Sequence, residues 1–107
     1  MRQWTVFVVT GHQQTIDIIT EAGEQIGCEV KVYRDGVSAL NALYENLWRR
    51  SFLIADEDMA DLPGSFIAER LLGIREMAEV ALLVSGTEKE LYTEVGFERI
   101  KSIIAKH

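Results

Sequence analysis

A short apolar run that stops at a cluster of acids is the feature that most constrains this sequence. Residues 52–55 (FLIA) are all apolar, and Asp56, Glu57 and Asp58 follow them directly. A run this short and this apolar is typical of a strand buried on both faces, as in the centre of a parallel sheet. In open α/β sheets the chemistry lies at the carboxyl ends of the strands. The run therefore predicts that Asp56 lies at a functional edge, or else that the acids only end a strand and enter a loop.

Strand patterns and helix patterns alternate along the rest of the chain. Aromatic and β-branched runs or polar–apolar alternation predict strands at residues 4–9, 29–34, 52–55 and 80–84. Apolar residues at helical spacing predict helices at residues 13–26, 37–50, 64–77 and 87–96. Residues 97–107 fit either a fifth strand, centred on Ile103 to Ala105, or a continuing helix, and we favour the strand.

Strands that alternate with helices at these lengths give βαβ units with right-handed crossovers. The predicted fold class is therefore α/β, a doubly wound parallel sheet of the flavodoxin-like type with strand order 2-1-3-4-5. Residues 1–107 are expected to form a single domain, because the chain length is near the mode for one hydrophobic core.

Charge and composition exclude several classes of function. The formal net charge of −6 argues against binding to nucleic acid or to an anionic membrane surface. No apolar run approaches the roughly 20 residues of a membrane span, and the amino terminus has no signal-peptide pattern. Cys28 is the one cysteine, which permits neither an internal disulfide nor a cysteine-rich metal site. A cytoplasmic protein is expected.

Four segments, in the right order, resemble the receiver domains of two-component response regulators (CheY-like). Residues 56–64 (DEDMADLPG) resemble the segment that runs from the phosphoacceptor aspartate to a turn glycine. Residues 35–40 (DGVSAL) resemble the entry to the second helix of that family. Ser85, followed by glycine, matches the hydroxyl residue after the fourth strand, and Lys106 matches the lysine that ends the fifth strand. The resemblance covers essentially the whole chain.

The resemblance implies a signalling module in a phosphorelay and not an enzyme. Its partner would be a histidine kinase or another signalling protein, whose phosphohistidine would pass a phosphoryl group to Asp56. Ser85 and Lys106 would then bond the phosphate and switch the shape of the domain.

The sequence departs from the family at the metal site. The family holds Mg²⁺ with an acidic pair after its first strand, and those positions fall here at residues 10–12 (Thr-Gly-His), none of which is a carboxylate. Mg²⁺ prefers oxygen ligands that include one or two carboxylates. Asp56, with Asp58 as a second carboxylate, would form only a weak site. We therefore expect the magnesium cofactor to be weak or absent. Of two roles for His12, a metal ligand or a polar residue that starts a helix, we favour the second.

The sequence also departs from the family at its end. Receiver domains finish with a fifth helix after the lysine, whereas this sequence stops at His107, so the terminal helix is expected to be missing. Parts of Val6, Val8, Leu53 and Ile103, or of their neighbours in the sheet, would then be exposed, and an exposed apolar patch typically marks an interface. Self-association, for example as a homodimer, is expected. The alternative is that residues 97–107 form a helix that closes this face.

Three functions stay open at this point. The first is a receiver-like module whose phosphorylation is weak or lost. The second is a pseudo-receiver that acts only by docking to another protein, an interpretation supported by the missing acids after the first strand. The third is a small nucleotide-binding or enzymatic domain on a flavodoxin-like sheet. It lacks support, because no glycine-rich phosphate loop and no Ser-His-Asp set is present.

Overall fold

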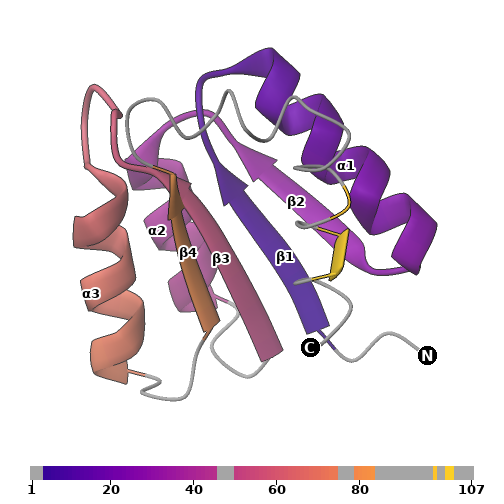
Figure 1. Ribbon diagram of the computed structural model, residues 1–107. Coiled ribbons are helices and arrows are strands. Elements are labelled where there is room, and N and C mark those ends of the chain that lie inside the picture. Colours follow the sequence, from indigo (N-terminus) through magenta and orange to yellow (C-terminus); the bar gives the residue numbers. More distant parts are fainter. Residues whose placement is uncertain (1–3, 46–49, 75–78, 84–97, 99–100, 103–107) are drawn as a thin grey trace.

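A parallel sheet with helices on both faces forms the fold. The computed structural model describes residues 4–45, 50–74, 79–83, 98 and 101–102 (Figure 1). In chain order the elements are β1 (Trp4–Val9), α1 (Gln13–Ile26), β2 (Glu29–Tyr33), α2 (Gly36–Glu45), β3 (Arg50–Asp56), α3 (Gly64–Ile74) and β4 (Glu79–Leu83). The strands pair in parallel in the order β2-β1-β3-β4. The predicted fold class and this part of the strand order are confirmed, and the predicted fifth strand lies outside the described residues.

The ends of α1 follow from local chemistry. The helix spans the predicted residues and ends at Gly27, whose φ of 87° lies in the left-handed region that glycine adopts without steric cost. The backbone N–H groups of Gly27 and Cys28 donate to the carbonyl of Gly23 at 2.8 and 3.0 Å. The chain therefore turns directly from α1 into β2, which lies at the edge of the described sheet.

Two boundaries differ from the sequence-based expectation. Arg50 was expected to end the second helix, but it begins β3, where it pairs with Trp4 of β1. The prediction was wrong because cross-strand pairing extends β3 beyond its apolar run, and apolarity was the only signal used. β4 similarly begins at Glu79, paired with Phe52. Residues 46–49 and 75–77, predicted to be helical, lie outside the described residues, as does the predicted helix at residues 87–96.

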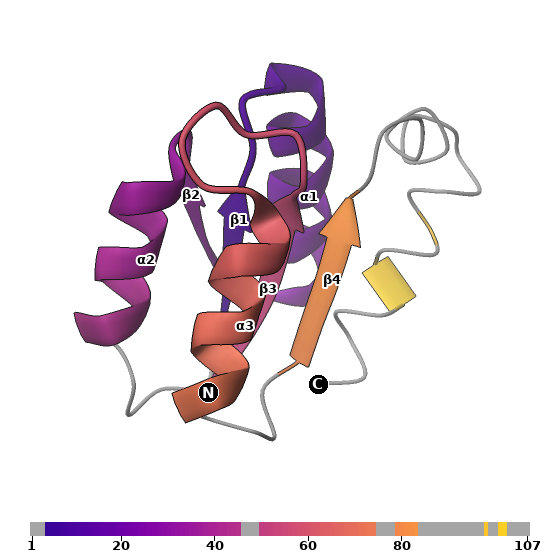
Figure 2. The same ribbon diagram turned by 90° about the vertical axis from the view of Figure 1, so that its left-hand side faces the viewer.

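Two apolar clusters hold the layers together. Figure 2 shows α2 and α3 side by side on one face of the sheet, with α1 on the other. The cluster under α1 contains Val6, Val8, Ile19, Ala22, Cys28, Phe52 and Ile54. The cluster under α2 and α3 contains Phe7, Val9, Ala39, Ala42, Leu43, Leu53, Ala55, Ile67, Ala68 and Leu71. Alternate residues of β1 and β3 thus face opposite layers, as the two-residue period of a strand requires.

The expected apolar patch is not found at the described residues that were predicted to form it. Val6, Val8 and Leu53 are each 0% exposed. Leu53 also lies on the opposite face, in the cluster under α2 and α3. This prediction was wrong because Val6 and Val8 are buried in the cluster under α1, and Leu53 is buried in the cluster under α2 and α3. The burial of these residues removes one reason to expect self-association, which stays a prediction.

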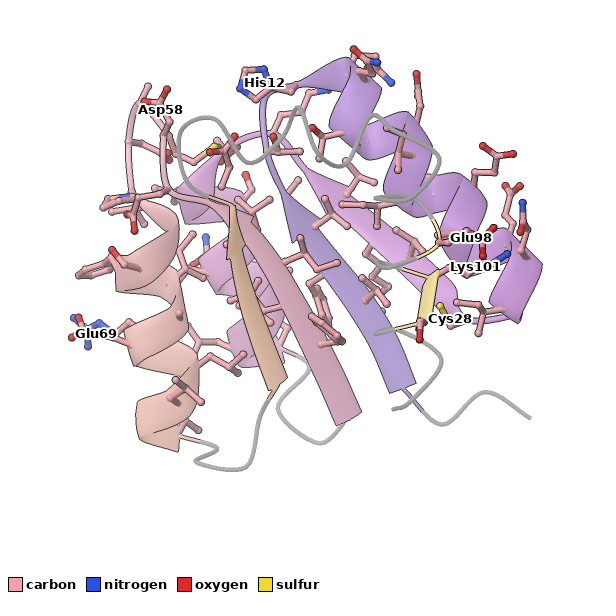
Figure 3. All side chains as sticks on the ribbon, in the orientation of Figure 1. His12, Cys28, Asp58, Glu69, Glu98 and Lys101 are labelled. Atoms are coloured by element: carbon pink, nitrogen blue, oxygen red, sulfur yellow. The ribbon has the colours of Figure 1, made fainter. Side chains whose placement is uncertain are left out.

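A short piece of chain near the carboxyl terminus lies beside α1. Glu98, Lys101 and Ser102 are helical, and Figure 3 shows Glu98 and Lys101 next to α1. The ammonium group of Lys101 donates to Gln25 Oε1 at 3.0 Å and lies 3.2 Å from the Glu98 carboxylate. The predicted strand at Ile103 to Ala105 lies outside the described residues. No helix in the described part of the chain is long and apolar enough to cross a membrane.

Candidate functional site

Parallel pairing brings the ends of β1 and β3 together at one edge of the sheet. Asp56 is the last residue of β3. Val9, the last residue of β1, pairs with Ala55, so Thr10 continues the chain alongside Asp56. The following turn leads into α1, which has His12 as its N-cap residue (Figure 3). Two adjacent strand ends and one helix start therefore build the site.

Donor groups of the protein surround the carboxylate of Asp56. The Thr10 hydroxyl donates to Oδ2 at 3.1 Å, and the backbone N–H of Asp58 donates to Oδ1 at 2.9 Å. His12 Nε2 lies 3.5 Å from Oδ2. The Asp56 side chain is 8% exposed, whereas that of His12 is 53% exposed. Each carboxylate oxygen of Asp56 thus has a hydrogen-bond donor from the protein, and such donors stabilise a buried carboxylate.

Thr10 links the two other members of the site. Its hydroxyl donates to Asp56 and at the same time accepts the backbone N–H of His12 at 3.2 Å. The turn at the end of β1 is therefore fixed to the end of β3 through one side chain that is itself 0% exposed. A hydroxyl that both donates and accepts in this way holds the three residues in one arrangement.

The two acids that follow Asp56 have different surroundings. The Glu57 carboxylate accepts the Ser65 hydroxyl at 2.8 Å and the Ser65 backbone N–H at 3.3 Å, which satisfies a donor in the first turn of α3. Asp58 is exposed and contributes its backbone N–H, as described above, to Asp56. Of these three acids, only Asp56 is buried.

The loop after β3 is fastened to the start of α2 by Asp61. The Asp61 carboxylate accepts the backbone N–H groups of Gly36 and Val37 at 2.9 and 3.0 Å. Gly36 approaches the loop so closely that a Cβ there would lie 2.6 Å from Cβ of Leu62. These hydrogen bonds, first from Gly36 and then from Val37, hold the pKa of Asp61 below its ordinary value. The loop that begins at Asp56 therefore ends against α2.

We predict that Asp61 stabilises the domain only while it is ionised. A folded-state pKa below the unfolded one means that the contribution is complete above the unfolded value, near pH 4, and is lost as the pH falls through the lower folded value. Asp61→Asn should therefore lower the melting temperature at pH 7, and the difference from the unmodified chain should shrink below about pH 4.

Thermal unfolding from pH 7 to pH 2 checks this dependence. Asp17→Asn is a matched control, because Asp17 is also exposed but accepts a side-chain amide, that of Gln13, at 2.7 Å. A constant difference between Asp61→Asn and the unmodified chain down to pH 2 would contradict the proposed role of the charge.

Comparison with known proteins gives matches only among solved structures. No protein-family model matches the chain, and no curated protein matches it in sequence. A response regulator receiver domain protein from Clostridium thermocellum has a TM-score of 0.74 at 17% identity, over 96% of this chain and 94% of that chain. A two component transcriptional regulator AraC from Clostridium phytofermentans has a TM-score of 0.73 at 13% identity, over 96% and 90%. The beryllofluoride-activated DrrB receiver domain has a TM-score of 0.65 at 21% identity, over 97% and 92%.

The chain has the receiver-domain fold. Within this fold, the residues predicted from the resemblance can be located. Asp56 lies at the carboxyl end of β3, with its carboxylate beside Thr10, and Asp58 lies two residues further on in the exposed loop. Ser85 and Lys106 lie outside the described residues, so their predicted proximity to Asp56 stays a prediction.

The donor set around Asp56 does not fit a magnesium ion. Mg²⁺ needs oxygen ligands in near-octahedral geometry and gives up its waters reluctantly. Here Oδ2 faces a hydroxyl that donates to it and an imidazole nitrogen, and Oδ1 faces a backbone N–H. Within the described part of the chain, no three His, Cys, Asp or Glu side chains are grouped so that they could hold a metal ion.

The sequence did not predict the contacts that Thr10 and His12 make with Asp56. Thr10 and His12 were treated as replacements for missing acids, and neither was expected to contact Asp56. The signal was present in part, because parallel strands that end together bring a hydroxyl after β1 next to an acid at the end of β3. The contact of His12 had no such signal, since it depends on how the turn after Thr10 folds.

Proposed function

We propose that this chain is a receiver-like signalling module in a two-component phosphorelay, with Asp56 at the phosphoacceptor position. The observation that supports this most directly is the burial of Asp56 at the carboxyl end of β3 in a receiver fold. Carboxyl ends of parallel strands are where α/β sheets carry their chemistry. A carboxylate is also a competent nucleophile for phosphoryl transfer.

The proposed reaction is a transfer between side chains. A carboxylate oxygen of Asp56 attacks the phosphorus of a phosphohistidine on a partner kinase, the P–N bond breaks, and the electron pair returns to the partner's imidazole. The product is an acyl phosphate on Asp56. The chain thus receives a group and is not itself an enzyme. Ser85 and Lys106 are proposed to bond the phosphate afterwards, as the receiver resemblance implies.

Phosphorylation is proposed to be weak. The Thr10 hydroxyl and the Asp58 N–H each donate to one carboxylate oxygen of Asp56, and hydrogen bonds that stabilise the carboxylate make it a weaker nucleophile. The site also has no second carboxylate in contact with Asp56 among its described contacts, so charge neutralisation by a cation is poorly supported.

The pseudo-receiver is the second candidate, and the same hydrogen bonds favour it. If the Thr10–Asp56 bond is structural, Asp56 serves as a buried link between β1 and β3, and the domain acts by docking to a signalling protein. A nucleotide-binding or enzymatic role has no described observation in its favour.

Labelling of Asp56 tests the proposal. We expect acetyl phosphate with Mg²⁺, or beryllofluoride, to label the unmodified chain at least about tenfold less than a Thr10→Asp/Gly11→Asp variant, a factor that corresponds to about 1.4 kcal/mol. A Cβ at Gly11 would meet nothing within 4 Å, so the backbone there leaves space for a side chain to begin. Intact-protein mass and ¹⁹F NMR measure the two labels, and the DrrB receiver domain, which is similar in fold, serves as a positive control.

Asp56→Asn in the double variant controls for the site of labelling and should abolish it. Equal and ready labelling of the unmodified chain would contradict the weak-receiver proposal. No labelling of the folded double variant would favour the pseudo-receiver instead. Circular dichroism of each variant separates these outcomes from a failure to fold.

A further inference from the structure

The side chains nearest to Asp56 at the end of β1 present a donor and an imidazole where the receiver resemblance calls for acids. Thr10 donates to Oδ2 of Asp56, and His12 Nε2 lies 3.5 Å from the same oxygen. Both contacts meet one carboxylate oxygen, and both come from a segment of three residues. The side of Asp56 that faces β1 is therefore filled by groups of the chain itself.

His12 stands at the start of a helix, next to a residue that contacts both a cation and an anion. Gln13, the next residue, accepts the guanidinium of Arg34 from the end of β2. The positive end of the α1 dipole lies at the same place, because His12 is the N-cap residue. A divalent cation at Oδ2 of Asp56 would thus meet an imidazole and the N-terminus of a helix.

We propose that His12 occupies the position of a second cation ligand, so that Asp56 is held by Thr10 and His12 and the site needs no divalent cation. His12 is then a positioning residue for the carboxylate. The inference rests on the proposed function only in taking Asp56 as the acceptor position, and its test measures cation binding directly.

The position of His12 explains why replacing this one residue should create a cation site. The imidazole of His12 already spans the distance from the start of α1 to Oδ2 of Asp56. The carboxylate of a glutamate reaches about as far from the backbone as Nε2 of a histidine. We therefore expect His12→Glu to bring a second carboxylate next to Oδ2 of Asp56, where the imidazole now lies. Two carboxylates with waters are a sufficient protein contribution for Mg²⁺ or Mn²⁺.

Binding of Mn²⁺, with Mg²⁺ as competitor, tests the proposal on the full chain. We expect the unmodified chain to show no saturable binding, measured by water-proton relaxation, at concentrations where His12→Glu is half saturated. Its affinity should be at least about tenfold below that of the variant. Added Mg²⁺ should displace Mn²⁺ from His12→Glu and raise the melting temperature of that variant only, because a ligand that binds the folded state stabilises it.

Gln14→Glu is the matched control. Gln14 is exposed, lies in the first turn of α1 and gains the same charge, but the structure gives it no contact with Asp56. We expect Gln14→Glu to bind Mn²⁺ no better than the unmodified chain, and we expect His12→Glu/Asp56→Asn to lose the gained affinity.

Either of two results would overturn the proposal. One is saturable Mn²⁺ binding by the unmodified chain that Asp56→Asn removes, since the site would then take a cation beside His12. The other is an equal gain in His12→Glu and Gln14→Glu, which would show a general charge effect. Weak phosphorylation does not bear on either result, so a failure of the proposed function and a failure of this inference remain distinguishable.

Discussion

Replacing Phe7 with alanine is expected to lower the free energy of unfolding by about 3–5 kcal/mol. Phe7 lies in β1 and is 0% exposed, in the cluster that joins the sheet to α2 and α3. Its ring stacks on that of Tyr33 with 6.2 Å between the centroids. Alanine removes this contact and leaves a cavity that the surrounding strands cannot fill by moving. Since a domain is stable by only about 5–15 kcal/mol, a large share of the stability is lost.

Urea denaturation of Phe7→Ala measures this loss, with Val37→Ala as the control. Val37 is 50% exposed at the start of α2, so its truncation should change stability by no more than about 0.5 kcal/mol. Equal effects of the two substitutions would contradict the placement of Phe7 between the sheet and the two helices.

The elements of the fold were predictable because their signals are local. The spacing of apolar residues fixed α1, and Gly27 marked its end. The parallel order of the first four strands followed from alternation of strand and helix, since right-handed crossovers leave few topologies. What the pattern did not contain was the pairing register. Cross-strand pairing alone makes Arg50 part of β3.

Register also explains the error about exposed residues. Val6 pairs with Phe52, and Phe7 pairs with Leu53, so Leu53 shares its face with Phe7. The sequence shows the alternation within each strand but not how two strands are aligned. The prediction therefore placed Leu53 with Val6 and Val8, on the wrong face of the sheet.

The candidate site was predictable in position but not in its contacts. The acid that follows the apolar run correctly indicated that Asp56 lies at the carboxyl end of a buried strand. The hydrogen bonds from the backbone N–H groups of Gly36 and Val37 to the Asp61 carboxylate join residues that lie 25 and 24 positions apart, and no local pattern predicts them. The contact of His12 with Asp56 likewise depends on the conformation of a turn. Long-range polar contacts of this kind need the fold before they can be inferred.

Two glycines of α3 are expected to respond to alanine in opposite directions. A Cβ at Gly64, the first residue of α3, would lie 2.7 Å from the carbonyl oxygen of Asp56 and 3.0 Å from Cβ of Ala55. The nearest atom belongs to the backbone of β3, which is paired with β1 on one side and β4 on the other and so cannot give way cheaply. Overpacking of this kind costs about 1–3 kcal/mol, so Gly64→Ala should destabilise the domain by that amount.

Gly73 supplies the matched control within the same helix. A Cβ there would meet nothing within 4 Å, so Gly73→Ala should stabilise the domain by up to about 1 kcal/mol, because alanine is the better helix former. Urea denaturation of both variants checks the two signs. Since Gly64 touches the residue that carries the site, Gly64→Ala should also shift the backbone amide resonances of Asp56 and Asp58, whereas Gly73→Ala should leave them in place. Stabilisation by both substitutions would mean that the start of α3 does not press on the end of β3, and the close approach that positions Asp56 would then be wrong.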